Sequence, residues 1–398
     1  MTKAATYFPF DVLGCPNNGS LPRAFVSPHR YIQGPGVLDG LGRYLSVLSC
    51  SRAGIMLSPR GRQAEGQRLE KILREANIEP EWSEFQGESS LEEITAHADR
   101  LAVCNVGCLV AFGGGKCVDA GKAVAYRLGV PVVIIPTLAS NDAPCSALSV
   151  IYTPEGVSVD VEFFPEHPVL VLVDTEIIAA APERYLVAGM GDAMATWYEA
   201  VACWSNPSGI NGVGTRPTLA AQAIAEACAK TLFQDGTAAA AAVVANRVDA
   251  ALENVVEANT LLSGLGFESG GLAAAHGVAQ SFTLLPQVHD DYLHGEMVAF
   301  GTLAQLMVQE QRVEALKVAE FFAAIGLPVH LGQLGLSSGD QTVLDTLVEG
   351  TLAFPFIGNL LQPLDADAVR AAILAAHQLG ETVSADIGDA AYRRVRNI

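Results

Sequence analysis

Short apolar runs and amphipathic segments alternate through the first half of the chain. Two segments of helical pattern, Arg62–Ala76 and Leu91–Ala102, carry their charges on one face. The runs around them are continuously apolar, which is typical of strands buried on both faces, and their alternation with helices favours a parallel sheet with crossover helices. We predict strands at Gly54–Leu57, Glu81–Phe85, Cys108–Phe112, Val130–Pro136, Leu148–Tyr152 and Val169–Val173.

Helical spacing dominates the second half, because strand patterns almost vanish after about residue 180. Apolar residues there recur with the period of a helix face, as at Leu303, Leu306 and Met307. The run Thr237–Ala245 predicts a helix of closely packed small side chains, since alanine is the best helix former. We predict helices at Glu183–Cys203, Pro217–Phe233, Val243–Leu265, Gly271–Leu284, Gly295–Gln311, Val313–Ile325 and Ala366–Leu379.

The two patterns together predict a fold of the α/β plus all-α class. We expect residues 23–180 to form an α/β domain with a parallel sheet and residues 181–398 to form an all-helical domain. Residues 1–22 look like an extension with a loop at Asn17, Asn18, Gly19 and Ser20, and we expect little function there. Sites commonly lie between domains, so the functional site is expected at that boundary.

Composition and charge narrow the class of protein. Half of the 398 residues are hydrophobic and 17% are charged, which is not the composition of a disordered chain. The net charge of −19 disfavours nucleic acid and anionic membranes as partners. No apolar stretch approaches the ~20 residues of a membrane span. The first twenty residues lack a signal-peptide core, and eight cysteines without a CxxC pair indicate reduced thiols, so we expect a cytoplasmic protein.

Three glycines and a lysine, Gly113–Lys116, lie between the predicted strand Cys108–Phe112 and a helical pattern, Lys116–Tyr126. A glycine-rich turn that opens a helix favours phosphate binding, because free N–H groups and the helix dipole face the anion. The segment matches neither GxGxxG nor GxxxxGK[ST], and a tight structural turn is the alternative. A second glycine pair, in Gly34-Pro35-Gly36, is interpreted as a turn.

A polar loop, Pro136–Ser146, follows the next predicted strand. Ligands bind at the carboxyl ends of parallel strands, so this loop could contact a cofactor and a substrate. The alternative is turn chemistry, in which Asn, Asp and Ser side chains satisfy their own backbone.

Asp192, His276 and His294 could form a metal site. Two histidines and one carboxylate with an open fourth position are typical of catalytic zinc, and the same donors suit Fe(II). Their spacings of 84 and 18 residues match no short metal motif, so each could instead be an ordinary core or surface side chain.

Several segments resemble the glycerol dehydrogenase branch of the iron-containing (group III) alcohol dehydrogenase superfamily. The resemblance runs from about Phe25 to the last helices, and the segments SNDAPCSALSVIYT and GLGFESGGLAAAH are its most specific parts. It implies a Rossmann-like N-terminal domain and an all-helical metal-binding domain, a frame shared with dehydroquinate synthase. The other segments that carry it include FGGGKCVDAGKAVAY, VLVDTEIIAAAPERYLVAGMGDAMATWYEA and HGEMVAFGTLAQL.

The resemblance also implies roles for individual residues. Asp192, His276 and His294 would bind zinc, with His276 also a candidate in the proton route, and Asp142 would contact the substrate hydroxyls. NAD would be the cofactor. Its phosphates would lie along Gly114, Gly115, Lys116, Cys117, Val118 and Asp119, and the rest of it along Thr137, Leu138, Ala139, Ser140, Ser146, Leu148 and Tyr152.

Three positions depart from the family pattern. Ser58 stands where the family has an Asp that grips the adenosine ribose, with Arg60 nearby, so NADP is not excluded. Asp290 and Asp291 replace a His pair that often precedes the last ligand. A late His-Asn appears here as Ile357-Gly358-Asn359, and these last two departures could change the substrate preference.

The implied reaction is transfer of a hydride from the secondary hydroxyl of glycerol, or a similar vicinal diol, to NAD, giving dihydroxyacetone. The alternatives are another alcohol, 1,2-diol or hydroxy-acid dehydrogenase on the same frame, a carbon–oxygen lyase similar to dehydroquinate synthase, and a non-catalytic binding protein. A lyase is disfavoured because Glu268, Asp290, Asp291 and Glu296 stand where a substrate phosphate would need basic residues. The family also implies a homo-oligomer, often an octamer.

Overall fold

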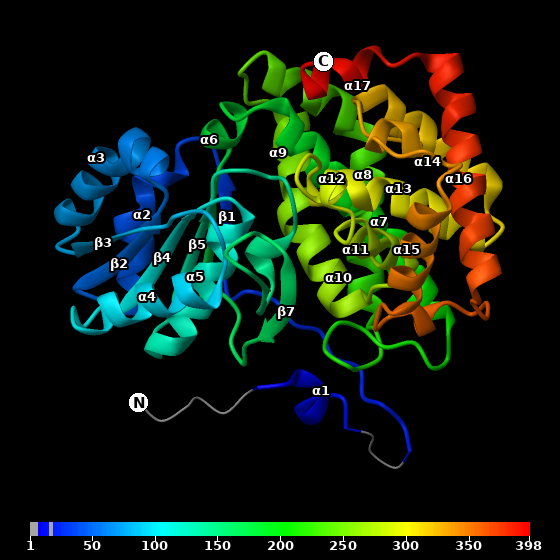
Figure 1. Ribbon diagram of the computed structural model, residues 1–398. Coiled ribbons are helices and arrows are strands. Elements are labelled where there is room, and N and C mark those ends of the chain that lie inside the picture. The colour runs from blue at the N-terminus through cyan, green and yellow to red at the C-terminus, as the bar shows by residue number, and fades with distance from the viewer. Residues whose placement is uncertain (1–6, 16–18) are drawn as a thin grey trace.

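The structure is a computed structural model that describes residues 7–15 and 19–398. An α/β part, formed by the first half of the chain, and a helical part, formed by the second half, lie side by side (Figure 1). This arrangement confirms the predicted fold class. The predicted domain limits, residues 23–180 and 181–398, remain a prediction.

A six-stranded sheet with strand order β1-β8-β5-β4-β2-β3 forms the α/β part, and all its pairings are parallel. Chain order reverses between β2 and β4, and such a reversal is where open α/β sheets bind ligands, at the carboxyl ends of the strands. Leu57 at the end of β2 pairs with Phe112 of β4, and Gly113 pairs with Pro136 of β5. The strands span Tyr31–Gly34 (β1), Arg52–Leu57 (β2), Glu79–Glu84 (β3), Cys108–Gly113 (β4), Val132–Pro136 (β5) and Leu170–Asp174 (β8).

Helices cover both faces of this sheet, as the continuous apolar runs predicted. Along β2, Ile55 and Leu57 pack into one core with Leu69 and Leu73, whereas Met56 belongs to the core on the other face. Successive side chains of a strand point to opposite faces, so a strand between two helical layers must be apolar throughout. The helices of this part are Leu41–Leu45 (α2), Pro59–Glu75 (α3), Leu91–Ala102 (α4) and Gly115–Leu128 (α5).

The sequence analysis did not predict β1 or the strand Ser158–Phe163, and one predicted strand lies in a different sheet. Leu148–Tyr152 (β6) pairs antiparallel with Ser158–Phe163 (β7) in a separate two-stranded sheet and is not part of the parallel sheet. β7 and the edge strand β1 are only partly buried, so neither has the continuous apolar run that marks a central strand.

The helical part confirms most of the predicted helices but not the long one at Val243–Leu265. There the chain leaves the helix after Val244, Asn246 takes a positive φ of 46°, and Asp249 caps a new helix. The helices are Thr175–Ala179 (α6), Glu183–Ser205 (α7), Leu219–Val244 (α8), Ala250–Glu257 (α9), Ser263–Gly270 (α10), Ala274–Phe282 (α11), Pro286–His289 (α12), His294–Val308 (α13), Arg312–Ile325 (α14), Gln341–Leu352 (α15), Ala366–Ile387 (α16) and Ala390–Arg396 (α17). None of these helices is long and apolar enough to cross a membrane.

A π-helix, Ala258–Leu262, joins α9 to α10. Single π-helical turns inside α-helices occur frequently at functional sites. Here the turn lies against the polar loop that follows β5, because Asn259 donates hydrogen bonds to the backbone carbonyls of Ala139 and Leu186.

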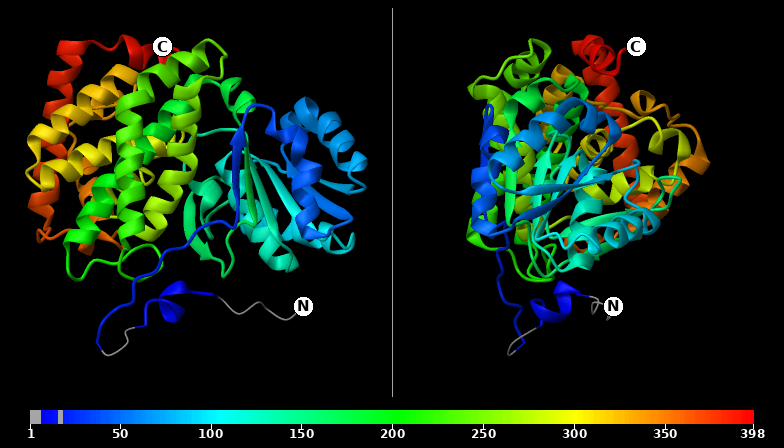
Figure 2. Two further views of the ribbon diagram at one scale, coloured as in Figure 1. Left: turned by 180° about the vertical axis from the view of Figure 1, so that it is seen from behind. Right: turned by 90° about the vertical axis from the view of Figure 1, so that its left-hand side faces the viewer.

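The N-terminal extension lies below the rest of the molecule in both views of Figure 2, and its aromatic side chains contact both parts. It contains a short helix, Pro9–Val12 (α1), and the ring of Phe10 lies 6.4 Å from Phe163 of β7 and 6.3 Å from Phe356 of the helical part. Of the predicted loop, Asn17 and Asn18 lie outside the described residues, and Gly19 is in a turn.

Candidate active site

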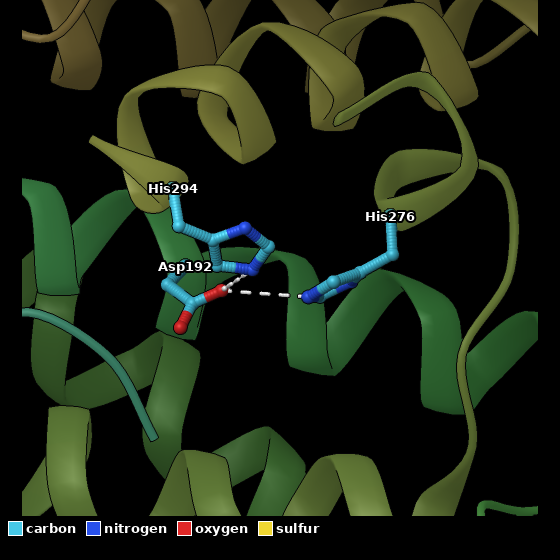
Figure 3. Close-up of side chains that lie close together, drawn as sticks. All are labelled: Asp192, His276 and His294. Atoms are coloured by element: carbon cyan, nitrogen blue, oxygen red, sulfur yellow. Dashed lines mark ion pairs between the residues drawn. The ribbon is translucent and has the colours of Figure 1, made fainter. Parts of the chain in front are cut away.

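Three helices of the helical part bring Asp192, His276 and His294 together, from the middle of α7, the first turn of α11 and the start of α13 (Figure 3). The Nε2 atoms of the two histidines each lie 3.4 Å from Oδ1 of Asp192. One donor atom from each residue fits within 4.8 Å of the others. α7 and α13 can approach this closely because Gly295 faces the carbonyl of Ala188, where any Cβ would collide.

The surroundings of Asp192 fit a metal ion. Its side chain is 1% exposed, and neither carboxylate oxygen has a hydrogen-bond partner among the described residues. Buried polar atoms without partners are rare because they cost free energy, so two on one carboxylate fit a site that binds a cation. Burial disfavours the charged form, but the two imidazoles outweigh it and lower the pKa of Asp192. Two imidazoles and one carboxylate are a donor set that suits zinc.

Glu199 orients His276 and was missed by the sequence analysis. Its Oε2 accepts a hydrogen bond of 2.6 Å from Nδ1 of His276, and its Oε1 accepts from the backbone N–H groups of Ala273 and His276. A carboxylate only accepts, so Nδ1 carries the proton and the lone pair of Nε2 points toward Asp192. The available signal was spacing, because Asp192 and Glu199 are seven residues apart and share one face of α7.

Two carboxylates near His276 shift the pKa of its imidazole. Burial disfavours the imidazolium, but Glu199 and then Asp192 outweigh burial and raise the pKa of His276 well above its usual value. The site therefore favours positive charge at this point, which a metal ion would supply.

The glycine turn begins α5 at the carboxyl end of β4, as predicted. Gly114 is the N-cap of α5, and a Cβ on Gly115 would collide with the side-chain amide of Asn141. Lys116 pairs with Glu88, with Nζ 2.5 Å from Oε1, and its ammonium lies 5.1 Å from the ring centre of Tyr152. The turn thus combines bare backbone at a helix N-terminus with one cation, which suits a phosphate.

The rest of the predicted phosphate strip faces inward. Cys117 and Val118 are buried in the core, so their side chains cannot reach a cofactor and only their backbone could. Asp119 is buried and pairs with Lys122, whose Nζ also donates to the carbonyl of Ala143 and to Oγ of Ser146. Burial raises the pKa of Asp119, and Lys122 opposes that shift. The hydrogen bonds from Lys122 to Ala143 and Ser146 tie the loop after β5 to α5.

The loop after β5 reaches into the helical part. Thr137, Leu138 and Ser140 are half-buried, whereas Ala139 is buried against α7. Asp142 accepts a hydrogen bond of 2.8 Å from the hydroxyl of Ser263. Burial and then the nearby Asp192 raise the pKa of Asp142 well above its usual value, against the opposing effects of His276 and Ser263. The structure thus brings Asp142 close to the candidate metal site.

Glu268, treated above only as an acidic residue, joins the two parts. Its Oε1 accepts from the backbone N–H of Ala147, and its Oε2 lies 2.7 Å from Nε2 of His167. The neighbouring Leu148 and Tyr152 are on β6 and half-buried, and Ser146 is fully buried.

The three departures have distinct structural settings. Ser58 follows β2 and caps α3, because its Oγ accepts from the backbone N–H of Gly61, while Arg60 is exposed. His289, next to the exposed Asp290, places Nε2 2.7 Å from the carbonyl of Gly156 in the β6–β7 turn. Asn359 is buried and donates to the carbonyls of Ile210 and Leu272, so it supports the segment before α11.

Comparisons with known proteins agree with this architecture. Residues 28–175 match the family model of iron-containing alcohol dehydrogenases. The chain is 43% identical to a glycerol dehydrogenase of Escherichia coli O6:H1 over 364 residues, 91% of this chain and 98% of that protein. It is 42% identical to one from Thermotoga maritima, over 89% of this chain and 97% of that protein. A solved structure of a probable glycerol dehydrogenase from Sinorhizobium meliloti has a TM-score of 0.84 at 39% identity and covers 91% of this chain and 100% of its own.

These matches and the two-part fold define an oxidoreductase of this class, and the chain belongs to the iron-containing alcohol dehydrogenase family. Within the family, the chain is similar over most of its length to glycerol dehydrogenases in particular.

Proposed function

We propose that this protein is a zinc-dependent glycerol dehydrogenase that uses NAD. The observation that carries the proposal is the cluster of Asp192, His276 and His294 beside the loop of Asp142, in a chain 43% identical to a glycerol dehydrogenase. In the reaction, the hydrogen on the middle carbon of glycerol leaves as hydride for C4 of the nicotinamide, and the hydroxyl proton is released. Glycerol and NAD⁺ thus give dihydroxyacetone, NADH and H⁺.

Zinc would be held by Asp192 and the Nε2 atoms of His276 and His294, and when bound it lowers the pKa of a substrate hydroxyl. Glu199 holds a proton on Nδ1 of His276, so that Nε2 is the nitrogen that faces the site. Asp142 accepts a hydrogen bond from a substrate hydroxyl and so orients the diol.

The cofactor side is formed by the ends of neighbouring strands. The N-terminus of α5 at Gly114–Lys116 binds the dinucleotide phosphates, and Ser58 faces the adenosine ribose. Thr137, Leu138, Ala139 and Ser140 follow the next strand and lie along the nicotinamide half.

The remaining expectations belong to the same proposal. The substrate is a small polyol, and neither nucleic acid nor a membrane is a partner, which the net charge of −19 supports. All eight cysteines are free thiols, which supports a cytoplasmic location. A homo-oligomer, an octamer by family resemblance, is proposed as the assembled form.

The test is a substrate and cofactor panel on the purified protein after chelation and reloading with zinc. Glycerol, 1,2-propanediol, ethanol and a 2-hydroxy acid are each assayed with NAD and with NADP. We expect the highest kcat/KM for glycerol with NAD, no activity after chelation, and recovery with zinc. A preference for ethanol or the hydroxy acid would contradict the substrate assignment, and activity that survives chelation would contradict the metal.

A further inference from the structure

Two buried hydroxyl groups lie behind Asp142. Oγ of Ser263, at the start of α10, donates to Oδ2 of Asp142 over 2.8 Å, and the hydroxyl of Thr196 on α7 lies 2.9 Å from Oγ of Ser263. Ser263 and Thr196 are both 0% exposed. The proposed roles of the metal site and of the cofactor contacts do not explain why these two hydroxyls lie there.

The direction of these hydrogen bonds follows from the chemistry of the groups. A serine hydroxyl has a single hydrogen, and Ser263 donates it to Asp142. Thr196 must therefore donate to Ser263, so both hydroxyls point their hydrogens toward the carboxylate. The hydrogen bond from Ser263 favours the ionised, acceptor-only form of Asp142 and so opposes the rise in its pKa that burial and Asp192 cause, and it engages Oδ2 rather than Oδ1.

The helical part holds the loop of Asp142 at three points along one continuous stretch. Asn259, in the π-helix, binds the carbonyl of Ala139. Four residues later Ser263 binds the side chain of Asp142, and a Cβ on Gly264 would lie only 2.8 Å from Cβ of Cys145. The π-helical turn ends immediately before Ser263, so a side chain of the helical part, and not the loop alone, contacts Asp142.

α7 carries the other end of the chain of hydroxyls. Asp192, Thr196 and Glu199 are spaced by four and three residues and share one face of this helix. One helix face thus presents a candidate metal ligand, the group behind Ser263 and the group that orients His276. Ser263 and Thr196 therefore link the side chain of Asp142 to the helix that carries Asp192.

We infer that Ser263, supported by Thr196, is a positioning residue that holds Asp142 ready to accept a hydrogen bond from the hydroxyl adjacent to the reacting one. It thereby favours vicinal diols and polyols over alcohols with a single hydroxyl. The inference rests on the proposed function, because it concerns the same substrate site.

The experiment compares Ser263→Ala, Ser263→Thr and Thr196→Val with the wild type. A matched control is Ser281→Ala, since Ser281 is equally buried but donates to the carbonyl of Val278 within α11. For each protein, kcat and KM are measured with glycerol and with 2-propanol, together with the dissociation constant of NAD and the zinc content.

We expect Ser263→Ala to lower kcat/KM for glycerol roughly tenfold, the size expected for one hydrogen bond to a charged group. The value for 2-propanol, NAD affinity and zinc content should change little. Ser263→Thr should restore most of the preference for glycerol, Thr196→Val should lose two- to threefold by a rough estimate, and Ser281→Ala should match the wild type. Equal losses for both alcohols in Ser263→Ala would overturn the inference, because they would indicate a structural role only.

Hydrogen–deuterium exchange of residues 137–147 separates this inference from the proposed function. If the zinc-loaded wild type oxidises no polyol, the proposed function fails. Faster exchange of this loop in Ser263→Ala than in Ser281→Ala would then still support the positioning role, and equal exchange would overturn it too.

Discussion

The two sides of the proposed active site are built in different ways. On the sheet side, the residues lie in two short stretches after neighbouring strands, Gly114–Lys116 after β4 and Thr137–Ser146 after β5. On the helical side, the groups come from three separate helices, and the buried residues Glu199 and Ser263 hold functional side chains in place. The sheet side therefore depends on backbone that must stay bare, whereas the helical side depends on side chains that orient other side chains.

This difference predicts two kinds of failure. A change in the glycine turn on the sheet side should weaken cofactor binding and leave the metal in place, and a change at the metal ligands or at Glu199 on the helical side should do the reverse. Variants that lose both properties together would show that the two sides are not independent.

The largest effect is expected from His276→Ala. Removing Nε2 takes away one of three candidate ligands, and a Lewis acid supplies several kcal/mol to the transition state, so turnover should fall by about a thousandfold or more at ~1.4 kcal/mol per decade. Zinc content after dialysis, measured by mass spectrometry, should drop, while NAD binding persists. His29→Ala is the control, because the His29 side chain is 49% exposed on the α/β part. Full zinc content in His276→Ala would refute the ligand assignment.

Glu199→Gln tests the helical side without replacing any of the three candidate metal ligands. The amide cannot accept from Nδ1 and from both backbone N–H groups as the carboxylate does, so His276 loses its fixed tautomer. Loss of such a partner typically lowers metal affinity 10- to 100-fold, and we expect a fall of roughly that size in zinc affinity. The control is Glu226→Gln, which removes a carboxylate from an exposed pair with Lys230. Unaltered zinc affinity would leave Glu199 as a cap of α11 only.

Gly115→Val tests the sheet side. The added side chain would collide with Asn141 and cover the N-terminus of α5, so KM for NAD should rise by roughly tenfold or more, at ~1.4 kcal/mol per decade, while zinc content stays the same. Gly339→Val is the matched control, since a Cβ on Gly339 would make only an ordinary contact of 3.6 Å with Oγ of Ser337 and its φ is not positive. A normal KM for NAD would make the glycine turn purely structural.

The sheet side of the site could be predicted from the sequence more completely than the helical side. The sheet side is local, so Gly113–Lys116 and the loop after Val130–Ile135 could be assigned to the carboxyl ends of strands from the pattern alone. The metal cluster required residues 84 and 18 positions apart to meet, and spacing could not show this without the family resemblance.

The residues that were missed act through other residues. Glu199 and Ser263 are buried polar side chains inside helices, and their sequence surroundings look like any other helix interior. The break at Asn246 and the π-helix before Ser263 were hidden because apolar residues continue through both at helical spacing. Tertiary packing, which the sequence pattern does not report, decides where such side chains point.

A smaller effect is expected from Ser58→Asp, which sharpens the description of the sheet side. A carboxylate would hydrogen-bond the 2′-hydroxyl of NAD and repel the 2′-phosphate of NADP, so the ratio of kcat/KM for NAD over NADP should rise by roughly tenfold, about 1.4 kcal/mol. Aspartate caps helices as well as serine does, so α3 should keep its stability. Thr218→Asp at the N-cap of α8 is the control for cap strength. An unchanged ratio would mean that position 58 does not face the ribose.

The smallest effect concerns a histidine pair outside both sides of the site. The rings of His330 and His377 lie 6.0 Å apart, and no residue in the described part of the chain forms a hydrogen bond with the buried Nδ1 of His330. Burial and then the neighbouring imidazole lower the pKa of His330, although Asp389 and Glu381 oppose the shift. The unfolded chain therefore binds a proton at a higher pH than the folded protein does. The contribution of His330 to the free energy of unfolding is complete above the unfolded pKa of about 6.5 and is lost as the pH falls through the lower pKa of the folded state.

We expect Tm to fall between pH 7.5 and pH 5.5, and to fall less in His330→Gln, while the zinc content of both proteins at pH 7.5 is the same. Identical pH dependence in the variant would assign the acid sensitivity to other groups, with the carboxylates and histidines of the metal site as the next to test.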